Sequence, residues 1–229
     1  MSEVRLNKFI AGSSQLSRRS ADAAIEQGRV FVNDRKATAG MHVKPGDTVF
    51  LDGEALTAPL QSHTILLNKP EGYVVSRNGQ GSRTVFSLLP EKYQHLQPVG
   101  RLDKHSSGLL LLTSDGELTQ TLTHPKYQKT KIYEVALDRP LAPLHHQMIT
   151  QIGVNLHDGP SKLGLERITE ASNTDWLVLM HEGRNRQIRR TFNALGYNVT
   201  RLHRTVFGPY KLPYDLASGS FVEMSPLAS

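Results

Sequence analysis

The chain has 229 residues and a formal net charge of +6, with 27 lysines and arginines against 21 acidic residues. It has no cysteine, which excludes a disulfide framework, a thiolate zinc site and a cysteine nucleophile. No apolar run approaches the roughly 18 residues of a membrane span, and the N-terminus has no apolar signal core. We therefore expect a soluble cytoplasmic protein without a membrane partner, with a monomer as the default state.

Positive charge is concentrated in two zones of the chain. Residues 181–211 contain seven arginines or lysines and one acid, Glu182, and residues 1–44 contain eight bases and four acids. Two separated basic zones on an otherwise balanced chain suggest a polyanionic partner that is bound at two places. Ordinary solvated surface charge is the alternative that charge alone leaves open.

Residues 1–51 have the pattern of a small α/β module. Ser17 is a suitable N-cap for a helix, and Gly28 is a suitable residue to follow its end. Turn residues separate the short apolar runs that follow, which is typical of strands. The predicted elements are a helix that ends at Gly12-Ser13-Ser14, a helix over 18–27, and strands over 30–32 and 49–51.

Residues 52–63 have turn residues and no periodicity, so they predict a linker. Residues 64–229 mix short apolar runs with helical patterns. This mixture predicts an α+β fold in which the larger domain is built on a mostly antiparallel sheet. Its predicted elements are strands over 64–67, 73–76, 109–113, 132–137 and 176–181, and helices over 117–123, 141–151 and 185–195.

One stretch of the larger domain combines a polar turn with a strongly apolar strand. The turn at 100–108 carries Asp103, and four consecutive leucines follow it at 109–112. A carboxylate on a loop that a buried strand holds in place is typical of a catalytic residue. A lone aspartate in a loop more often forms an Asx turn or caps a helix, so Asp103 needs partners to count as a catalyst.

Two further segments carry candidate chemistry. Tyr133 alternates with Lys131 and Val135 along one strand face, where it is either a core residue or a surface on which a base packs. In the helix predicted over 185–195, Arg189 lies beside the apolar face and could point inward. Arginines crowd the start of this helix against its dipole, which suggests a site that awaits a phosphate or a carboxylate.

The sequence shows no glycine-rich phosphate loop and no Ser-His-Asp order, and no histidine pair at a spacing that would indicate a metal site. The adjacent His145 and His146 cannot face the same way on a helix, and both are expected at the surface.

The N-terminal segments 5–10, 17–21 and 25–33 resemble the small RNA-binding domain first named for ribosomal protein S-four. Arg18 and Arg19 open a helix whose N-terminal N–H groups also attract phosphate. Arg5, Lys8 and Arg29 would extend that surface. No aromatic platform is evident in these segments, so recognition of backbone and shape is expected.

Five later segments resemble, in order, the pseudouridine synthases of the RsuA/RluB/RluE/RluF group. Together with the N-terminal module they cover nearly the whole chain. They are NKPEG at 68–72, GRLD at 100–103 with SGLLLLT at 107–113 and DG at 115–116, KIYEV at 131–135, DGP at 158–160, and EGRNRQIRR at 182–190.

The resemblance implies isomerisation of a specific uridine to pseudouridine in RNA, with ribosomal RNA as the expected partner and no cofactor. Asp103 would act as nucleophile or base, Arg189 would pair with it, and Tyr133 would pack on the base. The target base must be flipped out of the RNA, and Arg101 would fill the vacated space. The residues implied to grip phosphates are Lys69, Arg184, Arg186 and Arg190, of which Arg186 stands where relatives often have histidine.

Two other classes of protein remain open from the sequence. A non-catalytic RNA-binding or ribosome-assembly protein that keeps the fold would explain the basic zones equally well. A metal-dependent RNA nuclease would cleave its substrate in a reaction that EDTA stops. The set of Asp103, Tyr133 and Arg189 favours the isomerase.

Overall fold

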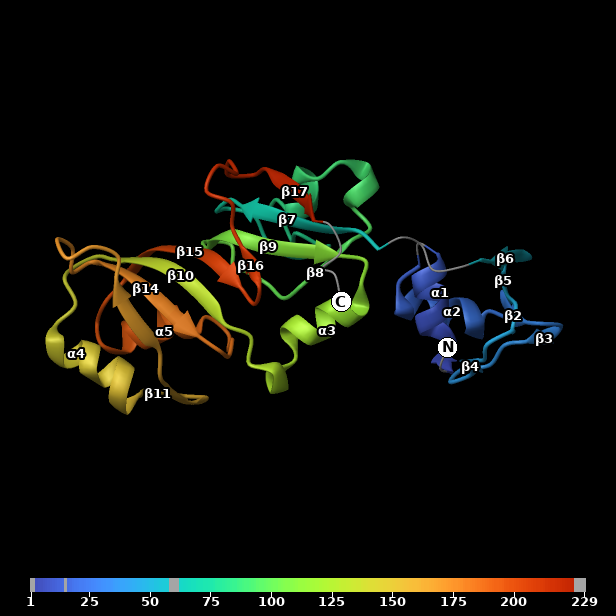
Figure 1. Ribbon diagram of the computed structural model, residues 1–229, viewed down its shortest axis with the longest axis horizontal. Coiled ribbons are helices and arrows are strands. Elements are labelled where there is room, and N and C mark those ends of the chain that lie inside the picture. The colour runs from blue at the N-terminus through green and yellow to red at the C-terminus, as the bar shows by residue number, and fades with distance from the viewer. Residues whose placement is uncertain (1–2, 15, 58–61, 225–229) are drawn as a thin grey trace. The chain divides into compact units, whose positions relative to one another are not determined.

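The computed structural model describes residues 3–14, 16–57 and 62–224. The chain divides into two compact units, residues 1–63 and residues 64–229, which appear in Figure 1 in blue and in green to red. The division falls between His63 and Thr64. Each unit has its own hydrophobic core.

The first unit packs two helices against a small antiparallel sheet with the strand order β3-β2-β5-β6. Its core includes the fully buried Ile10 and Val30. Ser17 caps the second helix, since its side chain accepts a hydrogen bond from the Ser20 N–H. The elements are β1 (Val4–Arg5), α1 (Leu6–Ser13), α2 (Arg18–Glu26), β2 (Val30–Val32), β3 (Arg35–Lys36), β4 (His42–Val43), β5 (Val49–Leu51) and β6 (Glu54–Leu56).

Two sequence predictions for this unit need correction. Helix α1 continues through Gly12 and Ser13, because helical hydrogen bonding ends only where the Ser14 backbone becomes extended. The predicted linker begins too early, because residues 54–56 form strand β6 and pair with β5. Residues 58–61, also predicted as linker, lie outside the described residues.

The second unit is built on a large sheet with the order β13-β14-β10-β15-β9-β7-β17, to which β8 and β16 add at β9 and β15. Its named strands pair antiparallel, except β9 and β15. The strands are β7 (Thr64–Lys69), β8 (Gln97–Pro98), β9 (Ser107–Thr113), β10 (Lys131–Leu137), β11 (Val154–Leu156), β12 (Gly159–Ser161), β13 (Gly164–Arg167), β14 (Asp175–Met180), β15 (Val199–Phe207), β16 (Tyr210–Lys211) and β17 (Phe221–Met224).

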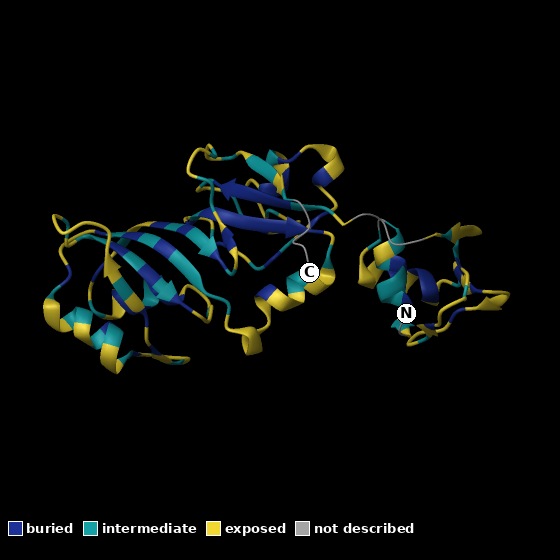
Figure 2. Cartoon of the chain, viewed as in Figure 1, coloured by how far each residue is buried: buried dark blue, intermediate teal, exposed yellow. Residues whose placement is uncertain are grey.

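Strand β9 is buried on both faces, as its four leucines predicted. Leu110 and Leu112 pack into one core cluster, whereas Leu109 and Leu111 pack into the other. Figure 2 shows β7 and β9 as adjacent dark strands. The rigid anchor predicted behind the Asp103 loop is therefore present.

The parallel pairing of β9 with β15 depends on Gly108. Only two pairs are in register, His203 with Ser107 and Arg204 with Gly108. A Cβ at Gly108 would lie 2.3 Å from the carbonyl oxygen of Arg204, and the φ of Gly108 is +98°. A side chain at this position would therefore collide with the backbone and strain it.

The helices of the second unit are short, and each lies in a connection between two strands of the chain. They are η1 (Val85–Leu88), η2 (Glu91–Tyr93), α3 (Gly116–Thr123), η3 (Pro125–Tyr127), α4 (Pro143–Gln147), η4 (Met148–Ile152) and α5 (Gln187–Ala194). The helix predicted over 141–151 is thus an α-helical turn that continues as a π-helical turn. Helix α5 begins two residues later than predicted, because Arg186 has a left-handed φ of +47°.

Two further predictions for this unit are wrong. Residues 73–76 form no strand, because Val74 makes only an isolated bridge to Thr84. His145 and His146 are half-buried rather than at the surface. His145 Nδ1 lies 2.8 Å from the Tyr197 hydroxyl, and the His146 ring packs 5.3 Å from the Trp176 ring.

Candidate active-site cleft

A cleft of about 1310 Å³ opens in the second unit. Its walls come from strands β10, β14 and β15, from the loop that carries Asp103, from the turn after α3 and from the segment that leads into α5. Asp103, Tyr133 and Arg186 all line it, so the fold brings together segments that lie far apart in the sequence.

Asp103 stands on the wall of this cleft with a side chain that is 36% exposed, so a substrate can reach it. Its Oδ2 atom lies 3.7 Å from Nη1 of Arg186, whose side chain is 46% exposed. The cation that forms an ion pair with Asp103 in the described part of the chain is therefore Arg186. The pairing implied with Arg189 is not the one observed.

Arg189 points inward, as the sequence suggested, but it binds backbone carbonyls. Nη1 donates to the Val199 carbonyl at 2.6 Å, and Nη2 donates to the His105 carbonyl. Burial lowers the pKa of Arg189 and the nearby Arg186 lowers it further, while Asp103 and Glu71 raise it. Arg189 thus holds the Asp103 loop by its backbone and adds positive charge behind the carboxylate.

Lys69, implied to grip phosphate, is fully buried. Its Nζ donates to the Ser106 carbonyl at 2.7 Å and to the Pro70 carbonyl at 2.9 Å. Burial lowers its pKa to about 8, although Glu71 and Asp103 oppose that shift. Lys69 therefore cannot contact RNA, and it fixes the far end of the Asp103 loop instead.

Arg184 and Arg190 are also engaged within the protein, because both bind Asp158. Arg190 Nη2 donates to Asp158 Oδ2 at 2.7 Å and Nη1 donates to Oδ1 at 3.0 Å. Arg184 Nη1 donates to Asp158 Oδ1 at 2.9 Å, and its Nη2 donates to the Pro160 carbonyl at 2.8 Å. The hydrogen bond from Arg190 and the two positive charges lower the pKa of Asp158 to about 2.

These contacts form a clamp between the β11–β12 hairpin and the start of α5, which we call the Asp158 clamp (Asp158, Arg184 and Arg190). A buried polar network lies beneath it. Gln187 Nε2 donates to Ser161 Oγ at 3.1 Å, and Thr191 Oγ1 donates to the same oxygen at 2.8 Å. The clamp and the network together fix the segment from which Arg186 reaches Asp103. The sequence marked residues 158–160 as a segment but gave no sign of this role.

Tyr133 lies on the cleft wall with only 8% of its surface exposed. It pairs across the sheet with Arg204, a buried residue that sequence reasoning missed. Arg204 Nε donates to the Leu109 carbonyl at 2.8 Å, so it joins β15 to β9. Burial lowers the pKa of Lys131, and Arg204 lowers it further. Lys131 and Arg204 both line the cleft near Tyr133, so they add positive charge to this part of its wall.

Arg101 is exposed and lines the cleft two residues before Asp103. In the first unit, Arg5, Arg18 and Arg19 are exposed, whereas Lys8 is half-buried. Arg29 forms an ion pair with Asp52, to which its Nε donates at 2.7 Å. Arg29 is therefore less available to RNA than the sequence implied.

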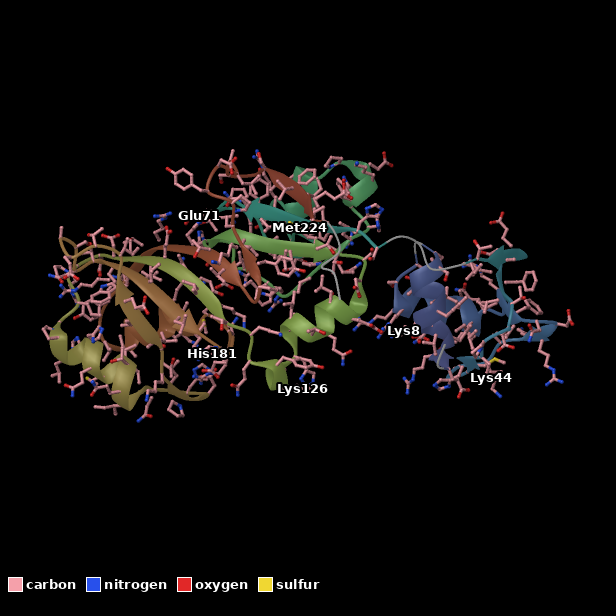
Figure 3. All side chains as sticks on the ribbon, viewed as in Figure 1. Lys8, Lys44, Glu71, Lys126, His181 and Met224 are labelled. Carbon is pink, nitrogen blue, oxygen red and sulfur yellow. The ribbon has the colours of Figure 1, made fainter. Side chains whose placement is uncertain are left out.

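No cluster of three or more histidine, aspartate or glutamate side chains that could hold a metal ion occurs among the described residues. Within that same part of the chain, no helix is long and apolar enough to cross a membrane. Figure 3 shows His181 near the end of β14 and Lys126 on the turn that follows α3, two segments that border the cleft.

Comparison with known proteins agrees with this fold and cleft. A family model described as RNA pseudouridylate synthase matches residues 63–194, and one described as S4 domain matches residues 4–49. The chain is 39% identical over 234 residues to ribosomal large subunit pseudouridine synthase B of Xanthomonas campestris, and the aligned region covers 97% of this chain and 48% of that protein. A crystal structure of a pseudouridylate synthase is 30% identical, with a TM-score of 0.69 over 97% of this chain and 96% of that one.

The chain belongs to the RNA pseudouridylate synthase family. Its relatives also include the dual-specificity RNA pseudouridine synthase RluF of Escherichia coli, 36% identical over 89% of this chain and 70% of that protein. Within the family it falls in the RsuA/RluB/RluF group, with an S4 domain at its N-terminus, as the sequence predicted. The chain spans about half the length of the first curated relatives that it matches.

Proposed function

We propose that this protein isomerises a specific uridine of ribosomal RNA to pseudouridine, with Asp103 as the catalytic carboxylate. The observation that carries the proposal is the placement of Asp103 in a cleft, accessible to a substrate and next to the Arg186 cation. The ionised carboxylate is the form that acts as nucleophile or base, and the Arg186 guanidinium lies 3.7 Å from its Oδ2 atom.

The reaction breaks the bond between ribose C1′ and uracil N1 and forms a bond between C1′ and uracil C5, after which C5 loses a proton and N1 takes one up. Asp103 serves at the ribose, either by attack at C1′ or by removal of a ribose proton. The detached uracil carries the electron pair of the broken bond, and the positive charge of Lys131 and Arg204 near Tyr133 favours its retention in the cleft. Tyr133 provides a rigid surface for the base.

The charge of the cleft fits a polyanionic substrate. Because the target uridine must leave the RNA stack to reach Asp103, phosphates on both sides of it approach the rim of the cleft. Exposed cations on that rim outnumber the acids and neutralise those phosphates. The exposed or half-exposed cations of the lining are Arg101, Lys129, Lys131, Lys162, Arg184 and Arg186.

The Xanthomonas relative is named as a ribosomal large subunit pseudouridine synthase, and we propose ribosomal RNA as the substrate class of this chain. The S4 domain adds an independent RNA contact through Arg18 and Arg19. Action as a monomer and a location in the cytoplasm remain predictions from the sequence.

The test uses ribosomal RNA labelled with tritium at uracil C5, because isomerisation releases that tritium as water. The protein is expected to release it without added metal, and Asp103→Asn is expected to release none while it still binds the RNA. Equal release by both proteins would refute the role of Asp103. Binding without release by the unmodified protein would point to a non-catalytic RNA-binding function.

A further inference from the structure

An exposed aromatic turn lies on the rim of the cleft and has no role in the site described above. It is the segment from His124 to Lys129 between α3 and β10, which includes η3 (Pro125–Tyr127). His124, Pro125, Gln128 and Lys129 line the cleft that contains Asp103. Tyr127, at the centre of this rim turn, is 42% exposed. Figure 3 labels Lys126 on it.

The rim turn holds its tyrosine ring among cations. Lys126 Nζ lies 4.6 Å from the centre of the Tyr127 ring, and Lys129 Nζ lies 5.7 Å from it. The His124 ring meets Tyr127 edge-on at 6.1 Å. The segment from His124 to Tyr133 contains three lysines and no acid. Exposed aromatic rings among lysines, without carboxylates, are the elements with which proteins bind unpaired nucleotides.

The turn is also held in shape before any RNA binds. His124 Nδ1 accepts a hydrogen bond from the Lys126 N–H at 3.2 Å, and Gln128 adopts a left-handed φ of +41° that ends the turn. A tyrosine has few rotatable bonds, so a ring on a fixed turn loses little conformational entropy when a base stacks on it.

We propose that Tyr127 is a stacking platform for an unpaired base of the substrate RNA next to the target uridine. This inference rests on the proposed function, since it names how the same cleft selects its RNA. The ammonium groups of Lys126 and Lys129 then serve the phosphates on either side of the stacked base. The protein would accordingly prefer a target uridine with an unpaired neighbour.

The first experiment uses fluorescence. Trp176 is the only tryptophan of the chain and is buried, so Tyr127→Trp places a second, accessible indole on the rim turn. Both this variant and the matched control Tyr214→Trp, at a fully exposed tyrosine of the same unit, carry Asp103→Asn to prevent turnover. The probes are a short oligouridylate and an abasic oligomer of equal length and charge.

Quenching of the Tyr127→Trp emission by oligouridylate, with none by the abasic oligomer and none in Tyr214→Trp, is the expected result. Equal quenching by both oligomers would mean that only phosphate attraction acts there, and it would overturn the inference. Bound oligouridylate that leaves the emission unchanged would overturn it as well.

The second experiment measures affinity for oligouridylate. Stacking contributes about 1–3 kcal/mol per base, so Tyr127→Ala is expected to weaken binding roughly tenfold to a hundredfold, while Tyr127→Phe keeps it. Unchanged affinity in Tyr127→Ala would contradict the inference. The proposed function is tested separately by tritium release from ribosomal RNA, so either claim can fail without the other.

Discussion

Nη1 of Arg186 lies 3.7 Å from Oδ2 of Asp103, although Asp103 comes from the loop before β9 and Arg186 from the segment between β14 and α5. Arg186 reaches this position from a left-handed backbone conformation at the N-cap of α5, which costs a non-glycine residue about 1–2 kcal/mol. The Asp158 clamp and the buried Gln187 network stabilise that conformation. Local strain here coincides with the residue that contacts the candidate catalyst.

Removal of the Arg186 charge should slow the reaction more than it weakens binding. An exposed ion pair at 3.7 Å contributes about 0.2–1 kcal/mol, so Arg186→Ala is expected to lower single-turnover tritium release by roughly 1.5-fold to fivefold. Arg186→His is expected to retain more activity at pH 6 than at pH 8, because imidazole loses its charge with a pKa of about 6.5. A pH profile identical to that of the unmodified protein would contradict this role.

Asp158→Asn should disturb Arg186 from a distance. Loss of the clamp is expected to lower the turnover rate with little change in the apparent affinity for RNA, and the loss should disappear in an Arg186→Ala background. Asp138→Asn is a matched control, since Asp138 also has a lowered pKa but binds Asn198. Additive effects of Asp158→Asn and Arg186→Ala would show that Asp158 does not act through Arg186.

The clamp also predicts acid sensitivity. The pKa of Asp158 in the folded protein is about 2, below its ordinary value of 3.8. Its contribution to stability is therefore complete above pH 4 and is lost as the pH falls through 2. Urea unfolding should show that the unmodified protein is more stable than Asp158→Asn at pH 5, with a difference that shrinks toward pH 2. A constant difference would contradict the lowered pKa.

Lys69 predicts a second rise of stability with pH, in the alkaline range. Its pKa is about 8 when folded and 10.5 ordinarily, so the unfolded chain binds more protons between these values and stability rises with pH in that window. The rise amounts to about 3 kcal/mol at most. Lys69→Met should lack this rise and should also lose activity, because the Ser106 carbonyl loses its donor. Parallel stability curves for the two proteins between pH 8 and 10 would refute the assignment.

Gly108→Ala should destabilise the second unit by more than about 2 kcal/mol, since its Cβ meets the Arg204 carbonyl oxygen at 2.3 Å in a left-handed backbone. Gly12→Ala is the control, because a Cβ there has open space within helix α1 and is expected to raise the stability of the first unit slightly. Thermal unfolding of both variants measures the two effects. A stable Gly108→Ala protein would mean that the β9–β15 pairing can shift.

The proposed RNA contact of the S4 domain can be tested through the salt dependence of RNA binding. Replacement of Arg18 and Arg19 by alanine should make RNA binding less sensitive to salt, since two phosphate contacts are lost. The slope of the logarithm of the binding constant against the logarithm of the salt concentration should become shallower by roughly 1.4. Arg29→Ala should change the slope less, because Arg29 is paired with Asp52. Equal slopes for the double variant and the unmodified protein would place the RNA contact elsewhere.

The sequence predicted those features that depend on local patterns. Four consecutive leucines identified β9, and Ser17 with Gly28 identified the limits of α2, because apolar runs and caps act over a few residues. The family of the chain also followed from its motifs.

The partners of charged side chains could not be predicted in this way. Lys69 was predicted to bind phosphate because nothing near it in the sequence indicates that it is buried. In the structure its ammonium group donates to the Ser106 carbonyl, 37 positions further along the chain. Arg184 and Arg190 looked free because Asp158 reaches them only through the β11–β12 hairpin. Arg186 pairs with Asp103, where Arg189 was predicted to do so. No sequence pattern predicts that an arginine before a helix adopts a left-handed backbone conformation. Such contacts arise from tertiary packing.

The narrow pairing of β9 with β15 has a mechanical consequence for catalysis. Asp103 lies on the loop that leads into β9. Arg186 lies at the start of α5, which is followed in the chain by β15. Two residue pairs in register join β9 to β15, and the hydrogen bonds from Arg189 to the His105 carbonyl and from Arg204 to the Leu109 carbonyl cross the same junction. Any change in this junction would therefore move Asp103 relative to Arg186.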